Sequence, residues 1–268
     1  MKKALLIIFV AVVILGSTLP SLGAISVPAD IKKTVCFIYI QKDGSEIPNG
    51  TGFFVSTQNP EKTITNVYLI TAKHVLQSDP EKGVFYKECI VRLTKKTGGV
   101  EKLLLPLVPE GKDKNIFCHT DPTVDIAVIP ALPNTELYDF KVFSMDYLTA
   151  KEDFGTLGVR EGSDVFFVGM FTPHLGEQQN YPIIRFGRVA LLSEERVRFM
   201  GQLRDLYLLE TFSFGGNSGS PVFIYLGSDR DPGGLMLGAP VLKLAGVMSG
   251  TFQSGSKVLE VPTSTSKI

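Results

Sequence analysis

The sequence has few cysteines and histidines and no excess of either charge. Its 268 residues include three cysteines and three histidines, and 27 basic side chains balance 27 acidic ones. Cys36, Cys89 and Cys118 form no Cys-x-x-Cys pair or cysteine–histidine cluster, so their spacing predicts no metal site. The balanced charge, with no basic patch, gives no electrostatic reason to expect a nucleic-acid partner. We therefore expect neither a metal nor another cofactor.

The composition is otherwise ordinary for a globular protein. Apolar residues make up 44% of the chain and charged residues 20%. These proportions exclude disorder and allow a buried core, and the length fits one domain or two small ones.

An uninterrupted hydrophobic run, Ala4–Leu15, follows two lysines near the N-terminus. Small residues then lead to Gly23, which gives the three-part form of a secretory signal peptide. We expect residues 1–24 to be a signal peptide, cleaved after Gly23 or Ala24, and the mature protein to be secreted or periplasmic. The run is short for a membrane span, but residues 4–19 as an uncleaved membrane anchor remain the alternative. No cysteine adjoins the cleavage site, so lipid attachment there is excluded.

Export would permit one disulfide among the three cysteines. Cys89 and Cys118 are the expected pair, because both lie between the two catalytic candidates described below. The alternative is that all three are small buried side chains.

A glycine-rich loop with a central serine, residues 215–219, lies between two apolar runs at 206–212 and 221–225 that predict strands. Glycine has no Cβ, so such a loop can bend sharply and approach a carbonyl group closely. The N–H groups of Gly216 and Ser218 are placed to form an oxyanion hole. A tight hairpin loop with a solvated serine is the alternative that this loop alone leaves open.

The sequence Gly-Asn-Ser-Gly-Ser-Pro at 216–221 resembles the nucleophile motif of the chymotrypsin-like serine peptidases. Two earlier phrases, Thr-Ala-Lys-His at 71–74 and Asp-Ile-Ala-Val at 125–128, resemble that family's other two catalytic motifs in the family's chain order. The resemblance implies that His74 is the general base, Asp125 orients it and Ser218 is the nucleophile.

The residues themselves give weaker but independent support. Imidazole has a pKa of about 6.5, so a histidine can accept and return a serine proton near neutrality. Residues 66–76 predict a buried strand that ends at His74, whereas His119 and His174 have no such context. Asp125 opens an apolar strand, while the alternative acid, Asp121, precedes a proline in an apparent turn.

The resemblance implies an all-β fold of two six-stranded antiparallel β-barrels with the active site between them. We expect the first barrel at 25–145, carrying the histidine and the aspartate, and the second at 146–268, carrying the serine. The last strand is expected at Lys257–Pro262.

The resemblance also predicts the substrate contacts. The base of the family's specificity pocket lies six positions before the serine, where this chain has Phe212 instead of an aspartate, so cleavage after Lys or Arg is not expected. Ser249, Gly250 and Thr251 end a predicted strand at 244–251 that resembles the one that pairs with bound peptide in this family. Asn217 replaces the aspartate that holds the freed N-terminus in many members, so we expect no activation switch of that kind.

Together these features predict an exported serine endopeptidase that acts on polypeptides. A serine esterase is a minor variant of the same chemistry. The alternative from a different class is a catalytically silent member that uses the scaffold as a binding or adhesion module, because fold does not imply activity.

Overall fold

The computed structural model describes residues 27–59, 61, 65–111, 113–227 and 240–252 of the chain. The expected signal segment, residues 1–24, and the expected last strand, Lys257–Pro262, lie outside the described residues.

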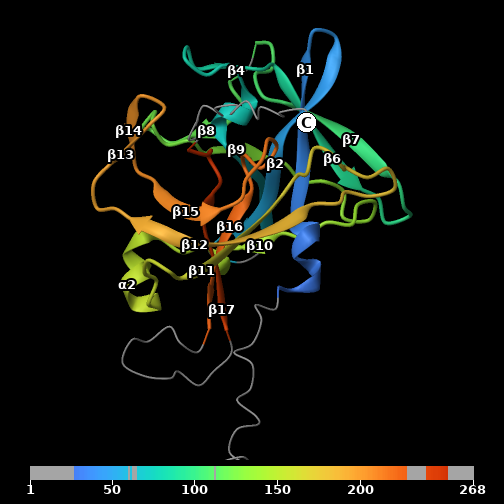
Figure 1. Cartoon of the computed structure of the whole chain (residues 1–268). Helices are drawn as coiled ribbons and strands as arrows, with labels where there is room; N and C mark the ends of the chain where they lie inside the picture. The colour runs from blue at the N-terminus through green and yellow to red at the C-terminus, as the bar shows by residue number, and fades with distance from the viewer. Residues whose placement is uncertain (1–26, 60, 62–64, 112, 228–239, 253–268) are drawn as a thin grey trace, which may run out of the picture.

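The first half of the chain forms an eight-stranded sheet (Figure 1). Its path runs in the order β7-β6-β1-β2-β3-β9-β8, and β10 pairs in parallel with β2. The strands are β1 (Val35–Lys42), β2 (Ser45–Gln58), β3 (Thr65–Thr71), β6 (Glu88–Thr94), β7 (Val100–Pro106), β8 (Phe117–Cys118), β9 (Ala127–Pro130) and β10 (Phe143–Ser144).

The second half forms a five-stranded antiparallel sheet in the order β15-β12-β11-β16-β17. Its strands are β11 (Asp164–Gly169), β12 (Ile183–Leu192), β15 (Tyr207–Thr211), β16 (Pro221–Leu226) and β17 (Val241–Val247). The fold is therefore all-β and built on two sheets, as expected. The described residues contribute eight and five strands instead of six and six.

Smaller elements connect and flank the sheets. Two short hairpins pair β4 (Gln77–Asp79) with β5 (Val84–Phe85) and β13 (Val197–Phe199) with β14 (Gln202–Arg204). The helical segments are short, of six residues or fewer: η1 (Ala29–Thr34), η2 (Lys73–Leu76), η3 (Met145–Tyr147), η4 (Lys151–Asp153) and α2 (Phe154–Leu157). Over the described ranges, none of the helices has both the length and the apolar character needed to cross a membrane.

Strand β1 is apolar on both faces because each face contacts a different cluster. Cys36 and Ile38 point into the core of the first sheet, whereas Phe37 and Tyr39 point into a smaller cluster with Met170. Side chains alternate along a strand, so a continuous apolar run results wherever both faces are covered. The strand turns back into β2 through Asp43 and Gly44, both at positive φ, as a tight hairpin requires.

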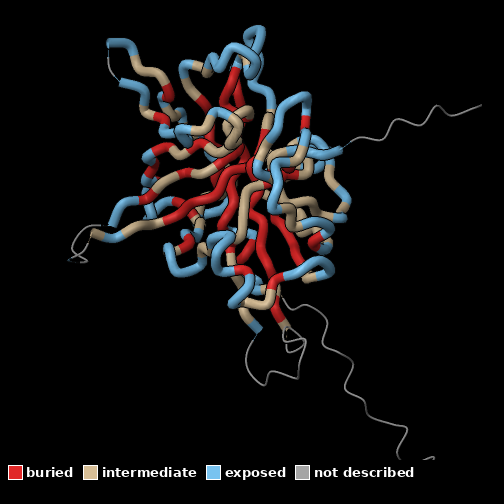
Figure 2. The backbone as a smooth tube through the Cα atoms, turned by 90° about the vertical axis from the view of Figure 1, so that its left-hand side faces the viewer, coloured by how far each residue is buried: buried red, intermediate tan, exposed pale blue. Residues whose placement is uncertain are grey.

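A third cluster lies between the two sheets and joins them (Figure 2 shows the buried chain at the centre of the molecule). Phe143 contacts Phe53 of β2 and Phe223 of β16, with ring centroids 6.3 and 5.3 Å apart. The connecting segment at 143–148 is attached to both sheets, because Phe143 pairs with Val55 of β2 and Leu148 bridges to Leu244 of β17.

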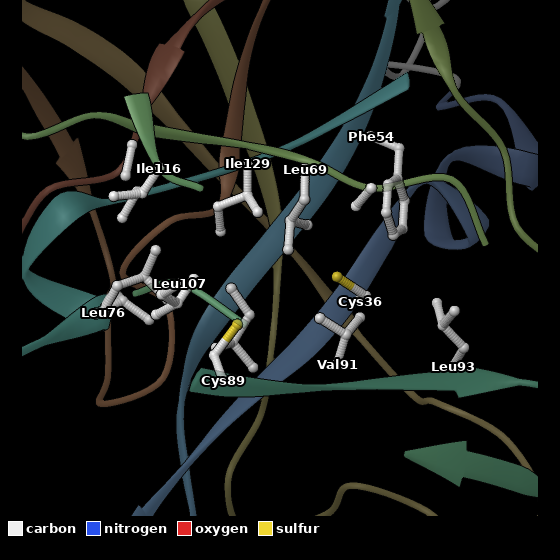
Figure 3. Close-up of a cluster of buried hydrophobic side chains, with 14 of the residues drawn as sticks. Cys36, Phe54, Leu69, Leu76, Cys89, Val91, Leu93, Leu107, Ile116 and Ile129 are labelled. Atoms are coloured by element: carbon white, nitrogen blue, oxygen red, sulfur yellow. The ribbon is translucent and has the colours of Figure 1, made fainter. Parts of the chain in front are cut away.

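All three cysteines are free thiols, so the expected pairing of Cys89 with Cys118 is wrong. Cys89 points into the core of the first sheet beside Cys36 and aliphatic side chains (Figure 3), whereas Cys118 is exposed. Burial raises the pKa of Cys89 to about 12, so this thiol remains protonated and acts as a small apolar side chain.

Candidate functional site

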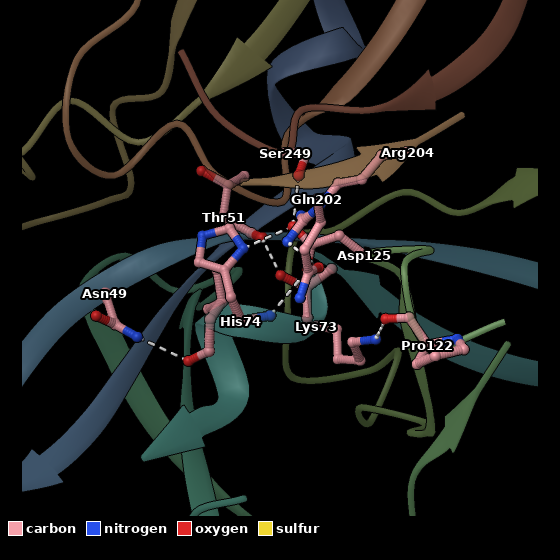
Figure 4. A network of polar contacts seen from close by, with 11 residues as sticks. Asn49, Thr51, Lys73, His74, Pro122, Asp125, Gln202, Arg204 and Ser249 are labelled. Carbon is pink, nitrogen blue, oxygen red and sulfur yellow. Dashed lines mark hydrogen bonds and ion pairs between the residues drawn. The ribbon is translucent and has the colours of Figure 1, made fainter. Parts of the chain in front are cut away.

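His74 lies on the single turn η2, not at the end of a strand, because β3 ends at Thr71. Its Nδ1–H donates to Asp125 Oδ2 at 2.7 Å, and its backbone N–H donates to Asp125 Oδ1 at 2.9 Å. Both carboxylate oxygens of Asp125 therefore hold the histidine (Figure 4). An imidazole held at Nδ1 presents Nε2 as the basic nitrogen.

A third hydrogen bond to Asp125 comes from the second half of the chain. Ser249 Oγ–H donates to Asp125 Oδ2 at 2.5 Å. Burial acts to raise the pKa of Asp125, but the hydrogen bonds from His74 and Ser249 outweigh it, so the pKa is lowered overall. The carboxylate, 9% exposed, therefore remains ionised at neutral pH beside the histidine. Sequence reasoning placed Ser249 among the substrate contacts and missed this bond.

Ser218 lies on the bend between β15 and β16, and its backbone is held from both sheets. Thr51 N–H donates to Ser218 O at 2.8 Å, and Gly219 N–H donates to Met248 O at 2.8 Å. These bonds hold the serine loop between β2 and the residue that follows β17. Within the described residues the Ser218 hydroxyl makes no hydrogen bond, to the His74 ring or elsewhere.

Gly219 is required where the serine loop meets the first sheet. Its φ is +87°, and a Cβ there would lie 2.0 Å from Thr51 O and 2.2 Å from Thr71 Oγ1. No side chain fits at that distance, so the close approach of the loop to β2 and β3 depends on glycine.

The expected oxyanion donors are available. In the described part of the chain, the N–H groups of Gly216 and Ser218 donate no hydrogen bond. Gly216 has φ +95°, a conformation that favours glycine. Two backbone N–H groups with no internal acceptor, beside a serine, form the pattern of an anion-stabilising site.

Asn217, between these two donors, is 1% exposed. With its amide oriented to satisfy both ends, Nδ2 donates to Met170 O and Oδ1 accepts from Phe214 N–H, each at 3.0 Å. The neutral amide of Asn217 thus holds the loop through two backbone groups.

Thr51 is a site residue that sequence reasoning did not select. Its buried hydroxyl donates to Gly216 O at 2.8 Å and accepts from Met170 N–H at 2.9 Å. Thr51 therefore connects the first sheet to the serine loop and to the end of β11. The phrase Gly-Thr-Gly at 50–52 was the available signal, since the flanking glycines allow this approach: a Cβ at Gly50 would lie 2.9 Å from Ser218 O.

A cavity of about 390 Å³ opens beside the site and extends between the strands of the second sheet. Ser249, Gly250 and Thr251 line it, as does Ser213. Phe212 does not line the cavity, and its side chain is 80% exposed, so its expected place at the pocket base is corrected. Side chains alternate along an extended segment, and here 211 and 213 point inward while 212 points outward.

The other candidates lie elsewhere. His119 accepts a hydrogen bond from Asp121 N–H at 3.0 Å, and Asp121 pairs with Arg196 at 2.5 Å. His174 lies in the loop after β11, with its ring 5.3 Å from Tyr181. Across the described ranges, no group of three or more His, Cys, Asp or Glu side chains could hold a metal ion.

Residues 50–230 match the family described as the trypsin-like peptidase domain. The chain belongs to this family. The match begins just before Thr51 and includes the positions of His74, Asp125 and Ser218.

Two solved structures are similar to this family member, each over 72% of its length. The protease domain of MamO from Magnetospirillum magneticum, in its apo form, has 18% identity and a TM-score of 0.45 over 79% of that chain. Deg5 has 20% identity and a TM-score of 0.42 over 75% of that chain. The curated proteins contain no match.

Proposed function

We propose that this member of the trypsin-like peptidase family is an exported serine endopeptidase with His74, Asp125 and Ser218 as its triad. The observation that carries the proposal is the paired hydrogen bonding of Asp125 to His74, at 2.7 and 2.9 Å, beside a serine loop with two unused N–H groups. This combination provides an oriented base, a hydroxyl and an oxyanion site.

In the proposed reaction, Ser218 Oγ attacks the peptide carbonyl while His74 Nε2 takes the hydroxyl proton. The ionised Asp125 stabilises the imidazolium that forms. The N–H groups of Gly216 and Ser218 donate to the carbonyl oxygen as it becomes negative. His74 then gives the proton to the leaving amine, the C–N bond breaks, and Ser218 is left acylated. Water, deprotonated by His74, attacks this ester, and Ser218 takes back a proton as the acid product leaves. In the free enzyme the serine–histidine bond is open, and catalytic hydrogen bonds of this kind shorten in the substrate complex.

The cavity supports a preference for apolar side chains before the cleaved bond. Its lining is mostly apolar, with Val189, Leu209 and Val222 among its walls. Because this lining is mostly apolar, we propose cleavage after apolar residues and not after Lys or Arg. Export rests on the lysines and the apolar run of residues 2–15.

The test is covalent labelling of the purified protein with a fluorophosphonate, with intact mass to locate the adduct. Labelling at Ser218 that Ser218→Ala and His74→Ala each abolish is the expected result. Ser45→Ala, which changes an exposed hydroxyl at the start of β2 and leaves the triad and the cavity lining in place, is the matched control and should label normally.

A folded protein that takes no label would contradict the peptidase and favour the silent binding module. Hydrolysis of paired peptides with Phe or Arg before the scissile bond then tests the specificity, and faster cleavage of the Arg peptide would overturn it.

A further inference from the structure

Arg92 is a charged residue buried in a position that the triad does not explain. It lies on β6 of the first sheet, is 4% exposed, and its guanidinium lies over the Phe37 ring at 5.9 Å. No carboxylate in the described residues pairs with it. A buried charge without an opposite charge requires strong compensating hydrogen bonds, so its partners indicate its role.

Within the described part of the chain, every hydrogen-bond acceptor of this guanidinium belongs to the loop that follows β11. Nη1 donates to Leu175 O at 3.1 Å and to Asn180 Oδ1, and Nη2 donates to Gly176 O. Asn180 returns a bond from Nδ2 to Arg92 O at 2.9 Å. Asn180 N–H also donates to Thr94 Oγ1 at 3.0 Å. The loop is thus hydrogen-bonded to β6 through its own backbone carbonyl groups and through the side chain of Asn180.

The conformation of the loop suits the binding of the Arg92 guanidinium. Gly176 has φ +83°, and a Cβ there would lie 2.3 Å from Gln179 O. Tyr181 N–H donates to Leu175 O at 3.3 Å and closes the turn. The turn therefore presents the carbonyl groups of Leu175 and Gly176 side by side, which suits the planar fork of an arginine better than the single ammonium of a lysine.

The same loop supports the oxyanion donors at its other end. Thr172 Oγ1 donates to Gly215 O at 3.1 Å, and Met170 O accepts from the Asn217 amide at 3.0 Å. The Met170 side chain fits against Gly216, where a Cβ would lie 2.8 Å from Met170 Cε. Met170 and Leu175 also pack with Phe37, in the cluster that lies beneath Arg92.

We propose that Arg92 is a positioning residue: it fixes the loop at 172–181, which in turn holds Gly215–Asn217 in the conformation that directs the oxyanion N–H groups at the substrate. This inference rests on the proposed function for its catalytic consequence. Arg92 itself touches neither the triad nor the oxyanion donors, and it acts through contacts that extend along the loop.

The test compares the wild type with Arg92→Met, Arg92→Lys and the matched control Arg188→Met, an exposed arginine on β12. With a peptide substrate, the Met variant should lose at least about tenfold in kcat while KM changes little, because misdirected oxyanion donors weaken only the transition state. The Lys variant should fall between the Met variant and the wild type, and the control should match the wild type. An unchanged kcat in folded Arg92→Met overturns the proposal.

Hydrogen exchange followed by mass spectrometry separates this inference from the proposed function. Faster exchange confined to peptides covering 170–181 and 214–219 in Arg92→Met is the expected result, and it does not depend on turnover. If the wild type hydrolyses nothing, the peptidase proposal fails, but this exchange pattern still decides whether Arg92 holds the loop. Unchanged exchange in both segments overturns the inference. If Arg92→Met does not fold, Asn180→Ala, which removes one acceptor, must show the same pattern.

Discussion

Asp125 accepts hydrogen bonds from three donors, two on His74 and one on Ser249, so its charge is held by both halves of the chain. We predict that Asp125→Asn lowers kcat/KM by about 10⁴, the cost of this change in a serine triad, because an amide stabilises the wrong tautomer of His74. Steady-state hydrolysis measures the loss, and a circular dichroism melt checks folding. A folded variant within tenfold of the wild type would remove Asp125 from the triad.

Ser249 gives a second prediction at this scale. Its hydrogen bond helps to lower the pKa of Asp125, so Ser249→Ala should raise that pKa toward the ordinary value. A depressed folded pKa contributes stability above the unfolded value, about 3.9, and this contribution is lost as pH falls through the folded pKa. Acid unfolding of Ser249→Ala should therefore begin at higher pH. Coincident acid-unfolding curves would argue against the bond, with Ser213→Ala, which makes no bond to Asp125, as the control.

The sequence was informative about the triad candidates because short motifs specify them. Thr-Ala-Lys-His and Asp-Ile-Ala-Val each mark one residue, and the structure brings His74 and Asp125 within hydrogen-bond distance. Their catalytic roles remain predictions. Arg92 escaped notice because its importance depends on partners more than 80 positions away, which no local pattern encodes. One partner of Thr51 is 119 positions away, and the glycines on either side of it were the only local signal. Phe212 was misplaced because spacing from the serine says nothing about the side of the chain on which a ring lies.

At the scale of elements, the conformation of the serine loop requires glycine at position 219 but not at position 215. We predict that Gly219→Ala destabilises the protein by more than about 2 kcal/mol and abolishes labelling of Ser218, because the methyl group meets Thr51 O at a left-handed backbone position. Gly215→Ala is the matched control, since a Cβ there meets nothing within 4 Å. Thermal denaturation and fluorophosphonate labelling measure both variants. Equal behaviour of the two would show that the loop adapts.

The strands on either side of the serine loop were predictable, and the short elements were not. The apolar runs at 206–212 and 221–225 became β15 and β16 with bounds within one residue. The predicted strand at 66–76 breaks at Thr71, because the backbone N–H of His74 and that of Lys73 bond to Asp125 instead of to a neighbouring strand. The β13–β14 hairpin has only three residues a side, and Phe199 packs against Gly250, a contact that sequence periodicity does not encode.

For the whole molecule, the aromatic cluster between the sheets should make the two halves unfold together. We predict that Phe143→Ala lowers the free energy of unfolding by about 3–5 kcal/mol while denaturation remains a single transition. Phe117→Ala, at a 58% exposed position, is the control and should cost little. Urea unfolding followed by fluorescence and by circular dichroism measures both. Two separate transitions in the wild type would mean that each sheet is stable alone.

The buried guanidinium of Arg92 determines which substitutions at position 92 a selection for stability and a selection for activity would each favour. Replacing Arg92 by an apolar side chain would remove the cost of burying an unpaired charge but would also take a donor from the carbonyl groups of Leu175 and Gly176, so the two effects on the stability of the fold oppose each other. A selection for heat resistance alone would accept methionine or leucine at position 92 only if the removed cost is the larger effect, whereas a selection for turnover would restore arginine. The residue found there after either selection would record which of the two demands had been imposed.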